Sequence, residues 1–139
     1  MFRPICVSLL LAAALVATGC NNTTTTPTSP TTPTTVTEPV YSGTLARNGA
    51  ATYPFVANTG TITATLTTLA PEGTLVTLAL GEWNATTQSC QLRITADDAA
   101  QGKVLIGSAQ VSQNYCVRIA DSTGQLATPA TYEITVSHF

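Results

Sequence analysis

The chain has 139 residues, a formal net charge of −2 and only 9% charged residues. Its five lysines and arginines form no basic cluster. Because nucleic-acid binding depends on neutralising phosphates with such residues, the composition excludes a nucleic-acid-binding protein. So few charges also leave little basis for electrostatic steering of a ligand.

The N-terminus has the organisation of an export signal. Arg3 precedes an apolar run over residues 5–17, which at about 13 residues is too short to span a bilayer. The small residues 17–19 then lead into Cys20, and this junction resembles the bacterial lipobox. The resemblance implies cleavage after residue 19 and acylation of the Cys20 thiol. The alternative is an ordinary secretory signal followed by a chance cysteine.

Acylation of Cys20 would anchor the protein without a spanning helix. One acyl chain binds a membrane only marginally, whereas two or more hold a protein stably. The bacterial lipoprotein modification that the lipobox resemblance implies adds several chains. Asn21 follows the cysteine, so no aspartate is present there to indicate retention in the inner membrane. We therefore expect a lipid-anchored protein of the cell envelope, in the outer membrane if the bacterium has two membranes.

Residues 20–39 are predicted to form a disordered linker. From Asn21 to Pro39 the chain is dominated by threonine and proline, with almost nothing apolar to bury. Spaced prolines favour extended polyproline II at about 3.1 Å per residue, so the segment could reach roughly 60 Å. Such stalks are also candidates for O-glycosylation. The segment is therefore interpreted as a tether.

Residues 40–139 are predicted to form a single all-β domain. Polar and apolar residues alternate in several segments, which places one set of side chains in a core and the other in water. Strands are expected at residues 41–45, 51–56, 61–67, 75–80, 91–95, 103–106, 115–119 and 132–137. Turn sequences rich in glycine and asparagine separate them. About eight strands and no helix predict an antiparallel, jelly-roll-like β-sandwich.

The strand sequences resemble those of bacterial pre-peptidase C-terminal domains. The opening segments Tyr41–Leu45 and Tyr53–Phe55 and the glycine-led strand at 60–66 match the start of that family. The segments 115–124 and 131–136 match its closing strands. The resemblance implies a jelly-roll-like sandwich that assists folding or attachment of exported enzymes, although no enzyme is joined to this chain.

Two cysteines remain in the domain, Cys90 and Cys116, and in an oxidising compartment they are expected to form a disulfide. The bridge would be worth about 3.5 kcal/mol in the chain-entropy model. Cys90 shares the parity of Leu92 and Ile94, whereas Cys116 points opposite to its core-facing neighbours. The bridge therefore requires the end of a strand or a bulge. Metal binding by the two cysteines is the alternative, but the sequence has no CxxC pair and His138 is its only histidine.

Little in the sequence indicates catalysis, a cofactor or a metal. The one histidine, His138, is penultimate and is expected to be solvated, and no nucleophile-elbow pattern is present. Asp97 and Asp98 are interpreted as part of a polar turn, with weak calcium binding as the alternative. We therefore expect a non-catalytic protein without a cofactor.

Trp83 is the most distinctive single residue, because it follows an apolar strand in the sequence Gly-Glu-Trp-Asn. Exposed, it could stack on a sugar ring while Glu82 and Asn84 bind hydroxyl groups. A lone tryptophan in a sandwich is more often a core residue or a lid over the strand ends. Two hypotheses follow: a surface module that binds a protein or an envelope glycan, or a structural envelope lipoprotein with no discrete ligand.

Overall fold

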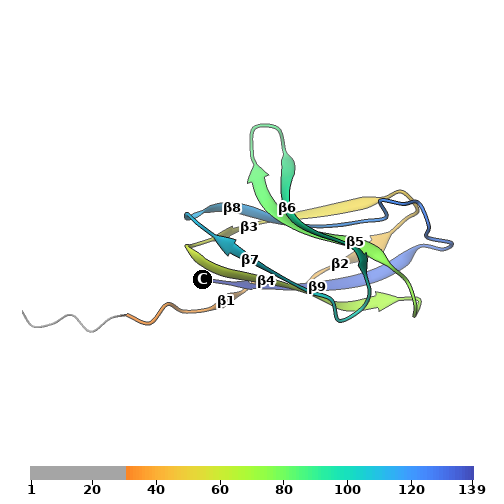
Figure 1. Cartoon of the computed structure of the whole chain (residues 1–139), viewed down its shortest axis with the longest axis horizontal. Helices are drawn as coiled ribbons and strands as arrows, with labels where there is room; N and C mark the ends of the chain where they lie inside the picture. The colour runs from red at the N-terminus through yellow and green to blue at the C-terminus, as the bar shows by residue number, and fades with distance from the viewer. Residues whose placement is uncertain (1–30) are drawn as a thin grey trace, which may run out of the picture. The chain divides into compact units, whose positions relative to one another are not determined.

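The computed structural model describes residues 31–139 (Figure 1). The predicted signal, Cys20 and the linker up to residue 30 lie outside the described residues. Within residues 31–139, no helix has the length and apolar character needed to cross a membrane.

The described part of the chain consists of nine strands joined by turns. They are β1 (Val36–Thr37), β2 (Tyr41–Leu45), β3 (Ala50–Ala57), β4 (Gly60–Ala70), β5 (Val76–Asn84), β6 (Ser89–Ala99), β7 (Val104–Ala109), β8 (Gln113–Ala120) and β9 (Ala130–His138). Strands β2 to β9 correspond to the eight predicted strands, and most are longer than expected. Strand β1 is additional and lies in the segment predicted to be linker.

The strands form two antiparallel sheets packed as a β-sandwich (Figure 1). Sheet A has the order β1-β9-β4-β7, with β2 also paired to β9, and sheet B has the order β3-β8-β5-β6. From β2 onward, consecutive strands alternate between the sheets, except in the β5–β6 hairpin. The orders 2-9-4-7 and 3-8-5-6 are those of a jelly roll, which confirms the predicted fold class.

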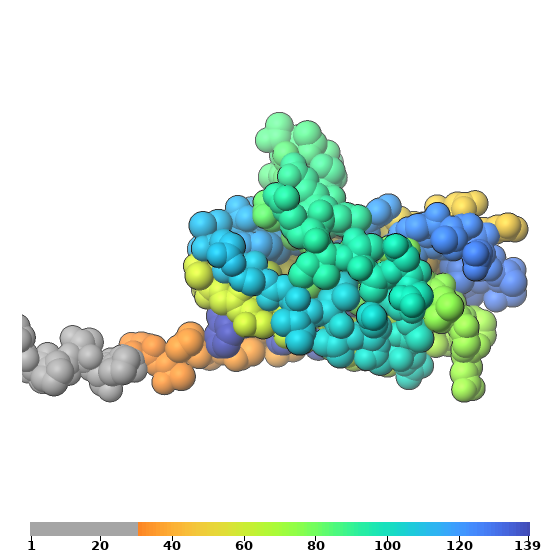
Figure 2. All heavy atoms as spheres, viewed as in Figure 1, coloured from red at the N-terminus to blue at the C-terminus, as the bar shows by residue number. Residues whose placement is uncertain are grey.

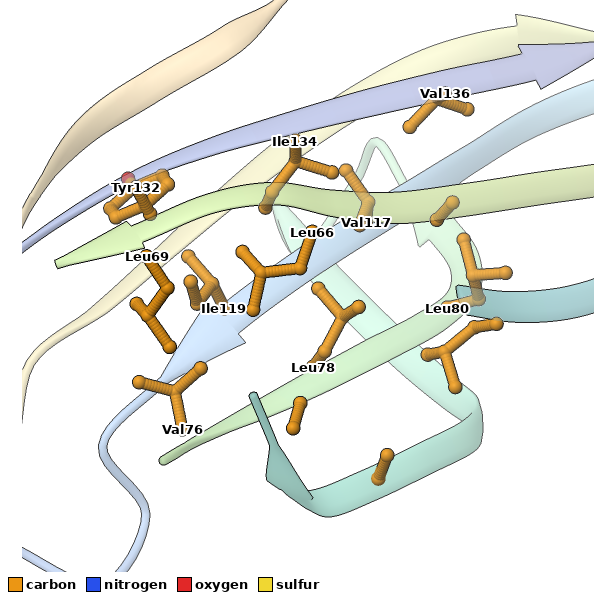
Figure 3. Close-up of a cluster of buried hydrophobic side chains, with 14 of the residues drawn as sticks. Leu66, Leu69, Val76, Leu78, Leu80, Val117, Ile119, Tyr132, Ile134 and Val136 are labelled. Atoms are coloured by element: carbon orange, nitrogen blue, oxygen red, sulfur yellow. The ribbon is translucent and has the colours of Figure 1, made fainter. Parts of the chain in front are cut away.

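The core lies between the inner faces of the two sheets (Figure 3). In β4 the alternation is as predicted, because Ile62, Ala64 and Leu66 are buried and the threonines between them are not. Leu78 of β5 and Ile134 of β9 are fully enclosed. Apolar burial of this kind, at about 25 cal/mol per Å² removed from water, is the main term that stabilises the sandwich.

The segment next to β1 is attached firmly to the sandwich through Glu38. Its backbone N–H donates to the carbonyl oxygen of Val136 at 2.8 Å, and its Oε1 lies 2.8 Å from His138 Nε2. His138 is only 4% exposed and stacks on Phe55, with ring centroids 5.4 Å apart. The expectation that this terminal histidine is solvated is therefore wrong. Alternate residues of β9 are buried as far as His138, and Glu38 contacts the buried imidazole.

Three tyrosines extend this contact, two of them from sheet A (Tyr41 and Tyr132) and one from sheet B (Tyr53). Tyr41 donates its hydroxyl to Glu38 Oε2 at 3.3 Å and stacks on Tyr53 at 4.7 Å. Burial, together with the neighbouring Glu38 charge and hydrogen bond, raises the pKa of Tyr41 to about 12. The Tyr53 and Tyr132 hydroxyls lie 2.7 Å apart, and burial followed by this hydrogen bond raises the pKa of Tyr132. Tyr41 and Tyr132 are therefore neutral hydrogen-bonding groups at neutral pH.

Asp121 joins two loops at one end of the sandwich. Its buried carboxylate accepts backbone N–H groups from Asn48 at 3.0 Å, Gln125 at 3.0 Å and Leu126 at 3.3 Å. Burial acts to raise the pKa of Asp121, but these backbone hydrogen bonds outweigh it and hold the pKa below its usual value. The ionised carboxylate is thus the form that the fold stabilises.

Replacing Asp121 with asparagine should lower the free energy of unfolding at neutral pH. It should also make that free energy depend less on pH in the acidic range. A lowered folded pKa means that the carboxylate stabilises the fold above the unfolded pKa, and that this contribution disappears as the pH falls through the folded pKa. Urea unfolding of both proteins across this acidic range tests the prediction. Asp98→Asn, at an exposed position, is the control and should change stability little; equal effects of the two substitutions would contradict the assignment.

Candidate functional site

The β5–β6 hairpin projects from sheet B beyond the body of the sandwich (Figures 1 and 2). Strands β5 and β6 remain paired to Asn84 and Ser89 at its tip. There the Asn84 side-chain oxygen accepts the backbone N–H groups of Thr86 and Thr87 at 3.0 and 3.1 Å. The hairpin is therefore an ordered projection with a hydrogen-bonded turn at its end.

A β-bulge at its base separates the projecting part from the rest of sheet B. Leu80 pairs with Ile94, but the next residue, Gly81, pairs with Leu92, so Arg93 is the additional residue. Gly81 is required here because a Cβ atom would press on the backbone of Gln91, 2.7 Å from its carbonyl carbon. The close approach of the two backbones explains why glycine occupies this position.

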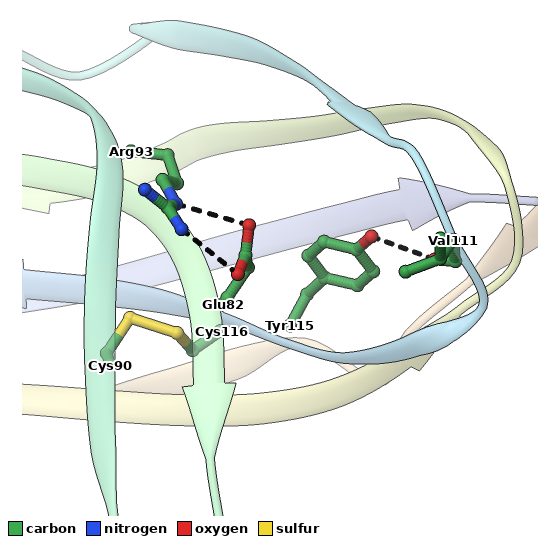
Figure 4. A network of polar contacts seen from close by, with 6 residues as sticks. All are labelled: Glu82, Cys90, Arg93, Val111, Tyr115 and Cys116. Carbon is green, nitrogen blue, oxygen red and sulfur yellow. Dashed lines mark hydrogen bonds and ion pairs between the residues drawn. A yellow bond between two sulfur atoms is a disulfide. The ribbon is translucent and has the colours of Figure 1, made fainter.

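The predicted disulfide between Cys90 and Cys116 is present, with the Cα atoms 5.9 Å apart (Figure 4). It joins β6 to β8, the two strands that flank β5. The bulge at Arg93 reverses the side-chain parity of β6, so Cys90 no longer shares the inward face of Ile94. This is the bulge that the cysteine parity required.

An ion pair lies beside the disulfide (Figure 4). Arg93 donates from Nε to Glu82 Oε1 at 3.1 Å and from Nη2 to Glu82 Oε2 at 3.2 Å. Exposed ion pairs contribute roughly 0–1 kcal/mol, so its main effect is to orient both side chains. In the same region the Tyr115 hydroxyl donates to the Val111 carbonyl at 2.8 Å and secures the neighbouring turn.

A shallow hollow of about 290 Å³ lies along the hairpin. The side chains around it come from both hairpin strands and from the start of β8: Glu82, Trp83, Asn84, Ala85, Gln91 and Gln113. Trp83 is half-buried and is not among the core residues, so the structure does not place it as a core residue. The three residues predicted to act together, 82–84, do line one concave surface. Gln91 and Gln113 were not anticipated, because only the tertiary structure brings them beside Trp83.

A larger groove, of about 730 Å³, lies between the loops at residues 70–74 and 100–102. Small and aliphatic residues line much of it, and it contains no aromatic side chain. Binding sites usually combine an apolar or aromatic surface with a few converging polar groups. Both sites combine apolar and polar groups, but only the hollow at Trp83 has an aromatic side chain among its converging polar groups.

Asp97 and Asp98 lie in strand β6 and not in a turn as expected. They occupy a second bulge, where the pairing moves from Leu78–Ala96 to Val76–Ala99. Asp97 accepts a hydrogen bond from the Thr77 hydroxyl at 3.4 Å. Within the described residues, no three His, Cys, Asp or Glu side chains gather as metal ligands would. The calcium interpretation therefore has no third carboxylate in this part of the chain.

No protein-family model matches this sequence, and no curated protein matches it. The resemblance to pre-peptidase C-terminal domains therefore stays a prediction.

Removing the disulfide should destabilise the fold and loosen the hairpin. In the chain-entropy model, replacing both Cys90 and Cys116 by alanine costs about 3.5 kcal/mol for the 26-residue separation. Thermal unfolding should show a lower Tm, and limited proteolysis should cut the hairpin sooner than in the wild type. The wild type under reducing conditions serves as the control and should behave like the double variant. An unchanged Tm in both cases would show that the bridge has no stabilising role.

Proposed function

We propose that this chain is a lipid-anchored, non-catalytic module of the bacterial cell envelope, and that its projecting β5–β6 hairpin binds a glycan. The observation that carries the proposal is the hollow around Trp83, held on a hairpin that is fixed by the Cys90–Cys116 disulfide. An acylated Cys20 would supply the membrane anchor, and the Thr/Pro-rich segment would separate the domain from the bilayer.

The chemistry of the hollow suits a neutral sugar. The indole of Trp83 offers an apolar face for the C–H groups of a pyranose ring, and the carboxamides of Gln91 and Gln113 can donate to and accept from hydroxyl groups. Arg93 already pairs with the carboxylate of Glu82. The hollow thus combines one aromatic surface and several neutral polar groups without a free charge.

The hairpin is also organised before any ligand arrives. The disulfide at Cys90 ties the β6 arm of the hairpin to β8, the bulge at Arg93 bends the strand at its base, and the Asn84 side chain orders its tip. Rigid binding surfaces gain affinity because less conformational freedom is lost on binding. This argues for a recognition surface over a passive loop.

The hairpin and the first described strand belong to different layers of the sandwich, because β1 is in sheet A and the β5–β6 hairpin is in sheet B. His138, the one histidine of the chain, is buried against Phe55, and within residues 31–139 its ring nitrogens contact Glu38 and the Phe139 carbonyl. An imidazole enclosed in this way favours a binding module over a hydrolase.

Trp83→Ala should abolish most glycan binding and leave the fold intact. The protein has one tryptophan, so its fluorescence reports directly on this hollow. The full-length chain is titrated with soluble peptidoglycan fragments, chitooligosaccharides and glucans. We expect a fluorescence change with at least one class, and a loss of about tenfold or more in affinity for the variant, measured by calorimetry, equivalent to about 1.4 kcal/mol.

Two further variants separate stacking from general surface effects. Trp83→Tyr keeps an aromatic ring and should retain part of the affinity. Leu75→Ala removes an exposed apolar side chain outside the hairpin and should bind like the wild type. If no glycan binds and Trp83→Ala only lowers the Tm, the glycan proposal is wrong, and a protein partner or a purely structural envelope role takes its place.

A further inference from the structure

The free edge of sheet A is the most unusual surface outside the hairpin. Strand β7 ends this sheet and has only β4 as a neighbour within it. The sequence of β7 is Val-Leu-Ile-Gly-Ser-Ala, with no charged residue and no proline. An edge strand of this composition offers its unpaired backbone groups as a template for another strand.

The other sheet edges within residues 31–139 carry features that block such pairing. Strand β6 has two bulges and the charged residues Arg93, Asp97 and Asp98. Strand β3 contains Pro54, which lacks a backbone N–H. The remaining edge of sheet A is divided between β1 and β2, with Pro39 between them. In the described part of the chain, β7 alone has none of these features.

The outward backbone groups of β7 coincide with its exposed side chains. Leu66 N–H donates to the Lys103 carbonyl at 2.9 Å, which sets the phase of the β4–β7 pairing. By the alternation of antiparallel pairing, the backbone groups of Val104, Ile106 and Ser108 point away from β4. Val104 is 45% exposed and Ile106 is 66% exposed.

We propose that β7 pairs antiparallel with β7 of a second copy of this chain, joining two A sheets across a two-fold axis at Ile106. In this register Ile106 faces its own counterpart, and Val104 faces Ser108 of the other copy. The three residues with outward backbone groups are then all paired in both copies. Val104 and Ile106 would also lose exposed apolar surface to the partner.

A second copy fits this edge because two β7 strands can pair about a two-fold axis without bringing like charges together. A two-fold interface uses the same patch on both partners, and an antiparallel strand pair satisfies that condition. The charged residue nearest to β7 in sequence is Lys103, and in this register the two lysines lie at opposite ends, about 20 Å apart at roughly 3.4 Å per residue. No carboxylate lies on β7, so the chain's net negative charge is not concentrated at the interface.

Cysteine cross-linking of the full-length chain in intact bacteria tests both the pairing and its register. Hydrogen-bonded antiparallel residues have Cα atoms about 5.5 Å apart, within the range of a disulfide. Ile106→Cys should therefore form a covalent dimer on a non-reducing gel. Val104→Cys alone should not, because its two copies would lie about 14 Å apart. The double variant Val104→Cys with Ser108→Cys should cross-link again.

Val56→Cys is the matched control, since Val56 is 61% exposed but lies on β3 beside Pro54. We expect several-fold more dimer from Ile106→Cys than from this control. Equal cross-linking of the two, or equal cross-linking of Val104→Cys and Ile106→Cys, would overturn the proposal. Ile106→Lys gives a second reading: the purified full-length chain should sediment as a monomer with an unchanged Tm, whereas the wild type is heavier. A wild type that sediments as a monomer would count against the pairing.

Discussion

The alternation of side chains along each strand is the constraint on which the rest of this structure depends. Every second residue of β9, and of β4 from Ile62 to Leu66, enters the core, so one added residue exchanges the two faces of a strand. Arg93 is such a residue in β6. It turns Cys90 away from the face of Ile94 and allows the bridge to Cys116. The disulfide and the bend of the hairpin both follow from that single shift.

Strand β9 is the last strand of the fold and pairs with β1 and β2 at the start of the domain. It pairs with β1, β2 and β4, which makes it the most connected strand of sheet A. Glu38 and His138, separated by 100 residues in sequence, meet at its end. The first and last strands of the described residues, β1 and β9, are therefore neighbours, and the chain enters the domain beside its last strand.

The two proposals describe surfaces that would reinforce each other. The hollow at Trp83 is shallow, and a shallow site that holds one sugar ring would bind weakly as a single copy. Pairing through β7 would present two such hairpins on one membrane-anchored unit. Linked sites raise the effective concentration of the second binding event, so a polymeric glycan would be held far more tightly than its single units. The dimer and the binding site nevertheless rest on separate observations and can fail separately.

The sequence by itself determined the all-β class, the eight strands of the jelly roll and the disulfide, because a period of two residues and two remaining cysteines are local or compositional features. It also placed residues 82–84 together, since they are adjacent in the chain. Only the tertiary structure decided that His138 is buried, that Asp97 and Asp98 occupy a bulge, and that Gln91 and Gln113 lie beside Trp83. Strand β1 was missed because two residues carry no detectable period. These outcomes depend on contacts between distant residues and on single-residue shifts in register, which leave no periodic pattern in the sequence.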